Sequence, residues 1–292
     1  MGLQLHQWSL TAVLAMLVIL LGLLVPLQGS GAVERFRPVM IHLLKSGLDR
    51  ELVERSFKGQ PELQLETVAS ALRIREARLN YSQYLEPWAL SKAQRFLREH
   101  GQLFDRAEAA YTVDRQTITA VLLIETRIGE YTGITPVLDI LATLALMDRR
   151  DYQDRIWSLL SPDDRRAYGR EAVDKRLARW AGRARKDLRA LLTWYAGRSH
   201  ELGSLKGSIM GAVGWPQFLP DNVLHYGVDG NGDGRIDLFE PDDTVFSVAK
   251  YLRSAGWRAG SLKARERAVL RYNHSRPYMQ TVLRIAELLK EP

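Results

Sequence analysis

One glutamate, Glu125, occupies a position where its side chain could serve as a general acid. Glu125 falls four residues after Val121 and seven after Ile118, so in a helix all three share one apolar face. Burial disfavours the charge of a carboxylate and the C-terminal end of a helix repels it, so both effects raise its pKa. An acid with a raised pKa can donate a proton near neutral pH. Glu125 is therefore a candidate general acid, with a structural ion pair to Arg127 or another arginine as the alternative.

The segment around Glu125 has the end signals of a helix. Asp114 is a typical N-cap, because its side chain can accept a hydrogen bond from a free N–H of the first turn. Gly129 is a typical C-terminal stop, because glycine readily adopts the left-handed conformation found there. We predict a helix between these two residues, with Glu125 in its last turn.

A second segment, residues 208–220, combines small residues, prolines, rings and polar groups. Its small residues allow close backbone approach, and its prolines fix a turn. The rings of Trp215 and Phe218 can stack on sugars, and the polar side chains of Ser208 and Gln217 can hydrogen-bond to them. The segment is a candidate wall of a sugar-binding groove, with a rigid surface turn as the alternative.

Residues 229–240 match the calcium-loop pattern at every specified position, including glycine at the sixth and glutamate at the twelfth. Closely spaced oxygen side chains repel one another unless a hard cation lies among them. The predicted ligands are Asp229, Asn231, Asp233 and, through its backbone carbonyl, Arg235. The flanking segments show no obvious helices, so we predict an EF-hand-like structural calcium loop. A metal-free turn is the alternative.

A third candidate binding segment, residues 271–278, precedes an amphipathic stretch at 282–289. Tyr272, Asn273 and Tyr278 can contact carbohydrate through rings, hydroxyls and an amide. A packed turn that caps a helix is the alternative.

The rest of the chain predicts helices that position these residues. Apolar residues recur at helical spacing from 33 to about 100, and residues 91–110 predict one amphipathic helix after a polar, aromatic connection at 80–84. With no repeat and no long linker, a mostly α catalytic unit over residues 33–292 is the simplest organisation.

Composition narrows the classes of partner and chemistry. The chain has 0 Cys, which excludes disulfides, thiol nucleophiles and cysteine zinc sites. Its net charge of +7 favours an anionic partner such as a membrane surface or an acidic polymer. Because no basic run carries interleaved aromatic residues, we expect no nucleic-acid partner.

The N-terminus indicates export. Leu10 to Leu27 is uncharged and nearly all apolar, and Ser30-Gly31-Ala32 has the small-x-small pattern of a cleavage site. We therefore interpret residues 1–32 as a signal peptide or an N-terminal membrane anchor. The sequence leaves these two alternatives open.

The order of these blocks resembles that of the membrane-bound lytic transglycosylase B family. The matching blocks are Glu-Thr-Arg-x-Gly at 125–129, Gly-Ala-Val-Gly-Trp-Pro-Gln-Phe-Leu-Pro at 211–220, the loop at 229–240 and Arg-Tyr-Asn at 271–273. Residues 137–145 and 243–257 look like two further helices of that family. The resemblance runs from about Ala89 to the C-terminus and more loosely back to Val33.

The resemblance implies a lysozyme-like, mostly helical fold with a small β-containing insertion near the calcium loop, and an exported, periplasmic enzyme. Family members cut the β-1,4 bond between N-acetylmuramic acid and N-acetylglucosamine without water, and the muramyl C6 hydroxyl attacks C1 to leave a 1,6-anhydro end. Glu125 takes the catalytic position and acts first as acid, then as base. This chemistry needs no second carboxylate, unlike that of most glycosidases.

The resemblance also implies the binding residues. The positions that line the glycan groove are Ser208, Gln217, Tyr251, Tyr272, Asn273 and Tyr278. Arg149 and Arg150 match a family arginine pair once a one-residue deletion is allowed. The implied calcium ligands are Asp229, Asn231, Asp233, Arg235 and, in last place, Asp243 rather than Glu240. Calcium would be structural, and no organic cofactor is implied.

Several residues depart from the family pattern. Ile128 replaces a usual aromatic residue, and Trp215-Pro216 alters the turn before Gln217, so subsite preference could differ. Without cysteine no lipoprotein anchor can form, so an anchor would be the N-terminal helix itself. A lysozyme-type hydrolase and a catalytically silent peptidoglycan-binding scaffold are the alternative functions. Expected partners are glycan strands, the membrane and other cell-wall enzymes.

Overall fold

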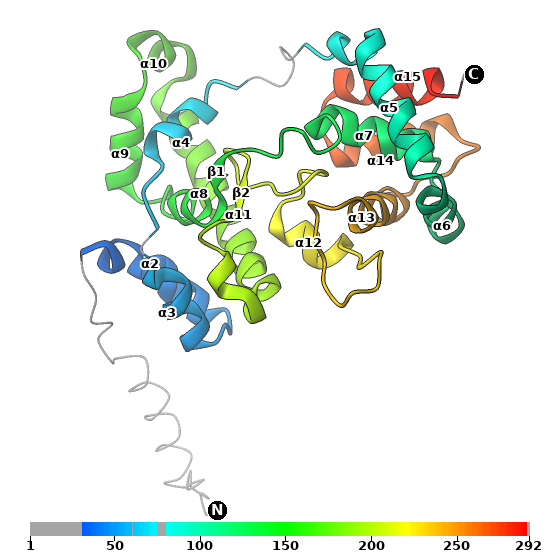
Figure 1. The fold of residues 1–292 in the computed structure, drawn as a ribbon. Helices are drawn as coiled ribbons and strands as arrows, with labels where there is room; N and C mark the ends of the chain where they lie inside the picture. The colour runs from blue at the N-terminus through cyan, green and yellow to red at the C-terminus, as the bar shows by residue number, and fades with distance from the viewer. Residues whose placement is uncertain (1–30, 60, 75–79, 291–292) are drawn as a thin grey trace, which may run out of the picture.

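The computed structural model describes residues 31–59, 61–74 and 80–290, which fold mainly into helices (Figure 1). One group of helices forms a first lobe: α2 (Gly31–Lys45), α3 (Arg50–Lys58), α4 (Leu65–Ala71), α8 (Val137–Leu144), α9 (Arg150–Leu159), α10 (Pro162–Tyr168) and α11 (Arg170–Trp194). A second group forms the second lobe: α5 (Pro87–Glu99), α6 (Gly101–Tyr111), α7 (Arg115–Thr126), α13 (Pro241–Ser254), α14 (Leu262–Tyr272) and α15 (Arg276–Leu288). The prediction of a mostly α protein is confirmed.

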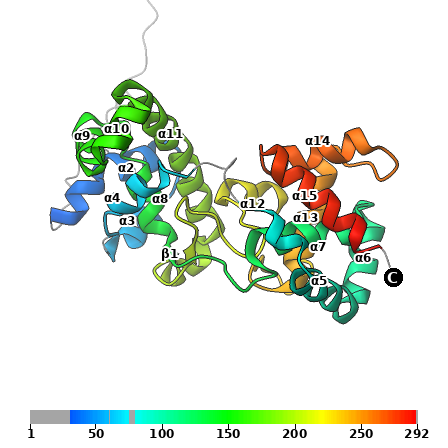
Figure 2. The ribbon, with the colours of Figure 1, turned by 90° about the horizontal axis from the view of Figure 1, so that it is seen from above.

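Each lobe has its own hydrophobic core, and the two lobes lie side by side when seen from above (Figure 2). The first core gathers buried residues from 36–72 and 137–238, and the second gathers them from 81–128 and 245–289. Tyr272 packs against both cores. The chain therefore passes back and forth between the lobes, and neither lobe is continuous in sequence.

Helix α7 begins and ends close to its predicted signals. Asp114 caps it by accepting a hydrogen bond from the Thr117 N–H at 3.2 Å. Residues 117–124 and Thr126 are buried, while Glu125 between them is partly exposed. The helix packs against α15, and it ends at Thr126 because Arg127 adopts the left-handed conformation.

The predicted helix over residues 91–110 is two helices in the structure. Helix α5 starts earlier, at Pro87, and ends at Glu99, and α6 starts at Gly101. His100, with φ of −115° and ψ of 28°, breaks the helical geometry between them. The apolar period runs through both helices, so the sequence pattern alone did not reveal the break.

The predicted β structure lies elsewhere than at the calcium loop. Strands β1 (Thr135–Pro136) and β2 (Lys206–Gly207) pair antiparallel between the lobes. Residues 229–240 contain no strand among the described residues. Backbone N–H groups of this loop donate to carboxylate and amide side chains of the loop, as at Asp229 and Asn231, rather than to a neighbouring strand.

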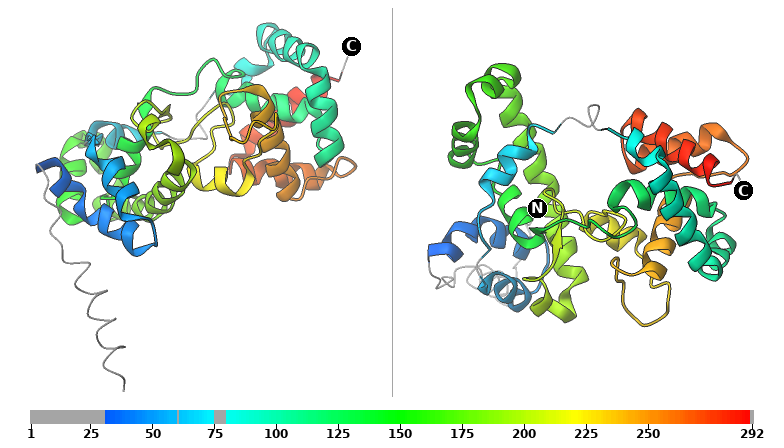
Figure 3. Two further views of the ribbon diagram at one scale, coloured as in Figure 1. Left: turned by 60° about the horizontal axis from the view of Figure 1, so that its bottom comes forward. Right: turned by 45° about the horizontal axis from the view of Figure 1, so that its top comes forward.

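Helices flank the calcium-loop segment on both sides; the helix after it was expected from the resemblance at 243–257, whereas the helix before it was not. Helix α12 (Pro220–Tyr226) precedes it and α13 follows it, and the loop extends from the ribbon in the right-hand view of Figure 3. The start of α12 is held by Asp187 of α11, whose Oδ1 accepts a hydrogen bond from the Asp221 N–H at 3.2 Å. Three-residue spacing of apolar positions is hard to detect in so short a helix as α12.

The described residues also contain two short 3₁₀ helices, η2 (Ser82–Leu85) and η3 (Ala196–Glu201). Within the described residues, no helix combines the length and apolarity that a membrane span requires. The apolar segment from Leu10 to Leu27, and with it the choice between signal peptide and anchor, lies outside the described residues.

Candidate active site

Glu125 lies in the last turn of α7 and receives a hydrogen bond from a buried tyrosine. The Tyr278 hydroxyl donates to Glu125 Oε1 at 2.7 Å. Tyr278 is 1% exposed, and burial, with the nearby Glu125 charge, raises its pKa well above the usual value. Tyr278 therefore stays neutral and acts as a fixed donor that orients the carboxylate. Its own ring meets that of Tyr81 edge to face at 5.8 Å.

A surface cavity of about 310 Å³ opens beside this pair. Its lining residues are Tyr84, Glu125, Thr126, Arg127 and Tyr131, and Glu125 is the one carboxylic acid among them. Burial raises the pKa of Tyr84, and the nearby Arg127 charge opposes this effect. The cavity therefore places the carboxylic acid of Glu125 next to two tyrosine rings and the guanidinium group of Arg127.

The turn after α7 has an unusual backbone. Arg127, Ile128 and Gly129 have φ angles of 52°, 57° and 82°, so two of three consecutive left-handed residues carry side chains. This conformation is costly for a β-branched residue such as Ile128. The Thr126 hydroxyl holds the turn, because it donates to the Trp215 carbonyl at 2.9 Å and accepts from the Gly129 N–H at 3.0 Å.

The predicted groove segment 208–220 docks onto this turn. A side chain at Gly129 would meet the Trp215 ring at 2.3 Å, so only glycine fits there. Gln217, itself left-handed at φ of 50°, donates from Nε2 to the carbonyls of Thr132 at 3.1 Å and Gly214 at 2.8 Å. The side-chain amide of Gln217 thereby ties the segment to the chain that follows Glu125.

Ser208 closes a small turn at the start of the same segment. Its hydroxyl oxygen accepts hydrogen bonds from the N–H groups of Met210 at 3.2 Å and Ala212 at 3.0 Å. Ser208 remains partly exposed, and its hydroxyl hydrogen can still donate to a ligand. The rigid-turn interpretation and the groove interpretation therefore describe the same residues.

The predicted tyrosines form an aromatic cluster behind the groove segment. Tyr251 and Tyr272 pack edge to face with centroids 4.8 Å apart, and Phe218 lies within 6 Å of both. The Tyr272 hydroxyl donates to the Pro216 carbonyl at 2.5 Å, and that of Tyr251 donates to the Arg271 carbonyl at 2.7 Å. Both hydroxyls thus hold backbone. Asn273 follows at the end of α14 and is partly buried.

The predicted arginine pair of the glycan groove lies on the other lobe from Glu125. Arg149 and Arg150 begin α9 in the first lobe, whereas α7 belongs to the second lobe (Figures 1 and 2). Both are exposed and pair with aspartates, Arg149 with Asp151 at 3.3 Å and Arg150 with Asp174 at 3.3 Å.

The calcium-loop residues are organised by hydrogen bonds to the backbone. Asp229 accepts from the N–H groups of Gly232 and Gly234 at 2.6 and 2.7 Å, and Asp233 accepts from the Arg235 N–H at 2.8 Å. In the described part of the chain, no three His, Cys, Asp or Glu side chains converge closely enough to hold a metal ion. The set of oxygen donors suits calcium, and Asp229 Oδ2 and Asp233 Oδ1, which each accept one N–H, retain a second lone pair.

Asp243 and Glu240 take different roles at the end of this loop. Asp243 is 1% exposed, and its two oxygens accept from the N–H groups of Gly230 at 2.7 Å and Asp237 at 2.6 Å. Glu240 caps α13 by accepting from the Asp243 N–H at 2.6 Å. The carboxylate that reaches into the loop is therefore that of Asp243.

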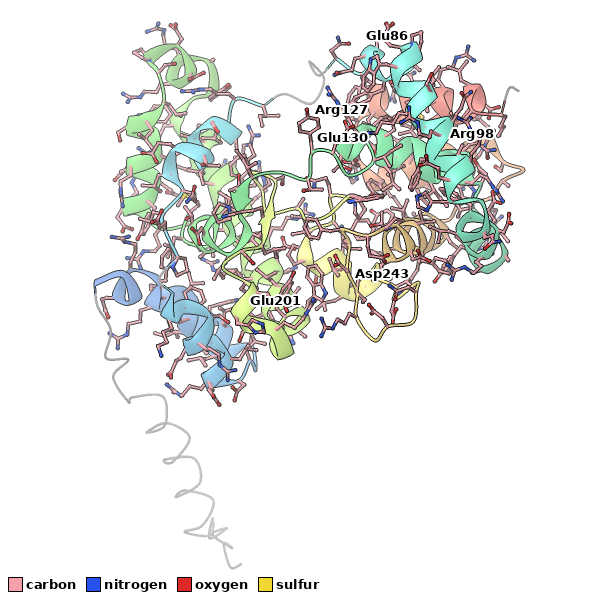
Figure 4. All side chains as sticks on the ribbon, viewed as in Figure 1. Glu86, Arg98, Arg127, Glu130, Glu201 and Asp243 are labelled. Atoms are coloured by element: carbon pink, nitrogen blue, oxygen red, sulfur yellow. The ribbon has the colours of Figure 1, made fainter. Side chains whose placement is uncertain are left out.

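Sequence reasoning missed part of the cavity wall. Tyr84 and Tyr131 line the cavity with Glu125, and Trp88 packs against Arg127. The aromatic connection at 80–84 was a signal for Tyr84, but Tyr131 and Trp88 carried none. Arg127 was considered only as an ion-pair partner. Figure 4 labels Arg127 at the edge of the second lobe that faces the first.

Comparison with known proteins identifies a family and a relative that are transglycosylases. The family described as Transglycosylase SLT domain matches residues 33–267. A membrane-bound lytic murein transglycosylase B of Escherichia coli (strain K12) is 30% identical over 165 residues. That match covers 56% of this chain and 38% of the relative, so the chain aligns with less than half of the relative's length.

Solved structures share the fold at lower sequence identity. SltB3 of Pseudomonas aeruginosa, in complex with NAG-anhNAM-pentapeptide, superposes with a TM-score of 0.71 at 22% identity, over 90% of this chain and 80% of that one. The Escherichia coli lytic transglycosylase solved in complex with calcium gives a TM-score of 0.65 at 21% identity, over 90% and 93% of the two chains. The helical fold of these lytic transglycosylases is therefore that of this chain.

Proposed function

Because the chain belongs to the Transglycosylase SLT domain family, we propose that it is a peptidoglycan lytic transglycosylase with Glu125 as its single acid/base. The observation that carries the proposal is a lone carboxylic acid in the cavity, oriented by Tyr278. The E. coli relative bears the name of this activity.

In the proposed reaction Glu125 protonates the oxygen that leaves the β-1,4 bond between N-acetylmuramic acid and N-acetylglucosamine. The resulting carboxylate then removes the proton from the muramyl C6 hydroxyl as that oxygen attacks C1. One bond breaks and one forms within the same sugar, so the strand ends in a 1,6-anhydro ring without added water. A carboxylate that both gives and takes a proton fits a site with one acid.

The proposed glycan groove runs past the cavity along the segment 208–220. Ser208, Gln217 and Asn273 would supply hydrogen bonds to sugars. Tyr251 and Tyr272 would act indirectly, since their hydroxyls hold the backbone at Arg271 and Pro216. Arg149 and Arg150, on the first lobe, would meet a strand only at a distance from the bond being cut.

Two alternative functions differ in their products. A lysozyme-type hydrolase would release hydrated reducing ends, and a silent peptidoglycan-binding scaffold would release nothing. Mass spectrometry of glycan strands digested by the protein separates the three: we expect anhydro ends, which are lighter by one water. Hydrated ends would instead identify a hydrolase, and undigested strands would identify a scaffold.

We also propose that calcium is a structural ligand of the loop at 229–243. Its ligands would be Asp229, Asn231, Asp233, the Arg235 carbonyl and Asp243. The complete loop pattern and the position of Asp243 support this ligand set. When bound, calcium would neutralise the closely spaced carboxylates and hold α12 and α13 together, away from the chemistry at Glu125.

Finally, we propose that the chain is exported to the periplasm. The apolar segment from Leu10 to Leu27 supports export, either as a cleaved signal or as an anchor that keeps the enzyme at the membrane. Glycan strands would be its substrate, and other cell-wall enzymes its partners.

A further inference from the structure

A cation is clamped between two exposed rings beside Glu125. The guanidinium carbon of Arg127 lies 5.2 Å from the centre of the Trp88 ring and 5.1 Å from that of the Tyr131 ring. The rings are exposed to 44% and 66%, which is high for large aromatic side chains. Arg127 and Tyr131 line the same cavity as Glu125. The clamp therefore faces the space where a substrate would lie.

Among the described residues no carboxylate forms a salt bridge with Arg127, although Glu125 lines the same cavity. Glu130, the nearest acid after Arg127 in sequence, pairs instead with Lys92. One side-chain hydrogen bond of Arg127 runs to Gln83 Oε1 at 3.5 Å, which is the limit for such a bond, and another runs to the Tyr84 hydroxyl. A guanidinium has five N–H donors in a planar fork, so the remaining donors are available to a ligand.

The backbone conformation of Arg127 is unfavourable for a residue with a large side chain. Arg127 has φ of 52° and ψ of 44°, a left-handed conformation that is disfavoured for residues with side chains. Asparagine or glycine would adopt this conformation more easily. A large cation in a strained turn next to the proposed catalytic acid points to a binding role.

We propose that Arg127, clamped between Trp88 and Tyr131, binds a carboxylate of the substrate. The inference rests on the proposed function, because a muramyl residue carries a carboxylate close to the bond being cut: that of its lactyl group where no stem peptide is attached, and those of the stem peptide where one is. Arginine pairs with a carboxylate through two parallel hydrogen bonds, and the rings keep its fork in place. The site would therefore favour acidic glycan over neutral glycan.

Binding to a non-cleaving variant tests this inference. In Glu125→Gln protein, calorimetry compares three ligands: chitin oligosaccharides, which have no carboxylate, peptide-free glycan strands, which expose the lactyl carboxylate, and peptide-bearing strands. Adding Arg127→Gln should weaken binding of the acidic ligands by about tenfold or more, the range for a hydrogen bond to a charged group. Binding of chitin oligosaccharides should change by less than about twofold.

Two further variants serve as matched controls. Arg98→Gln removes the same charge from an exposed site on α5 of the same lobe, and it should leave all three affinities unchanged. Arg127→Lys keeps the charge but loses the planar fork, so it should recover part of the lost affinity. The acidic ligand that loses more to Arg127→Gln identifies which carboxylate is bound.

The outcomes separate this inference from the proposed function. An equal loss for all three ligands, or no loss, would overturn the role of Arg127 while cleavage by the unsubstituted protein upheld the function. Failure of the Glu125→Gln protein to bind any strand, together with no cleavage by the unsubstituted protein, would overturn both.

Discussion

Replacing Asp187 with asparagine should stabilise the protein at pH 8 and not at pH 4. Asp187 of α11 is 2% exposed, and burial raises its pKa to about 6 from the usual 3.8. The Asp221 N–H at 3.2 Å and Arg183 at 3.7 Å only partly oppose this effect. Ionised Asp187 therefore costs free energy in the folded state.

The raised pKa of Asp187 determines the sign and the size of the expected change in stability. The folded state holds the proton of Asp187 more tightly than the unfolded state does, so the stability from this group is full below about pH 4 and is lost as pH rises through about 6. A shift of about two pKa units corresponds to about 3 kcal/mol of unfolding free energy. Asparagine keeps an acceptor for the Asp221 N–H but has no charge to bury.

Urea unfolding of both proteins at the two pH values measures the effect. We expect similar free energies at about pH 4, and a gain of up to about 3 kcal/mol for Asp187→Asn at about pH 8. Asp163→Asn, at an 89% exposed carboxylate of α10, is the control and should change little at either pH. If Asp187→Asn instead destabilised the protein at pH 8, Asp187 would act as an ionised partner of Arg183, and the burial argument would be wrong.

Three further predictions concern the reaction, the metal and export. Glu125→Gln should lower the cleavage rate by about 10²–10⁴-fold while circular dichroism and strand binding stay unchanged; retention of more than a few per cent of the rate would exclude Glu125 as the acid. Calcium at 100 times its Kd should stabilise the protein by about 2.7 kcal/mol. Melting curves with calcium and with chelator should differ for wild type and for Glu240→Gln yet nearly coincide for Asp243→Asn, and the reverse pattern would assign Glu240 as the ligand. If residues 10–27 form an uncleaved anchor, N-terminal sequencing should find Met1 in the membrane fraction, whereas soluble protein that starts at Val33 would exclude an anchor.

The sequence predicted features that depend on neighbouring residues. Asp114 caps α7 as expected, because a cap uses only its own side chain and the next turn. Glu125 takes its place at the edge of a buried face for the same reason, since helical spacing determines which residues share a face. The helix at 137–145, which the family resemblance implied, is also confirmed, in α8.

Features that depend on distant parts of the chain were not predictable in this way. The clamp on Arg127 joins Trp88 of α5 to Tyr131 after α7, and no local pattern connects them. The break at His100 was missed for a local reason, because the apolar period continues through it. Arg149 and Arg150 were assigned by resemblance across a deletion, and the structure places them on the first lobe, where Asp151 and Asp174 pair with them.

The alternation of the chain between the lobes has a consequence for biosynthesis. Glu125 and Tyr278, which share a hydrogen bond, are 153 residues apart, and Tyr278 lies in α15, the last helix. During synthesis the second core stays open until α15 is made, because α7 packs against it. A chain that stops before Arg276 would carry Glu125 without its donor and without a closed core. If Glu125 is the acid of the proposed reaction, a nascent or truncated copy would lack a complete site until the helix at 276–288 has docked.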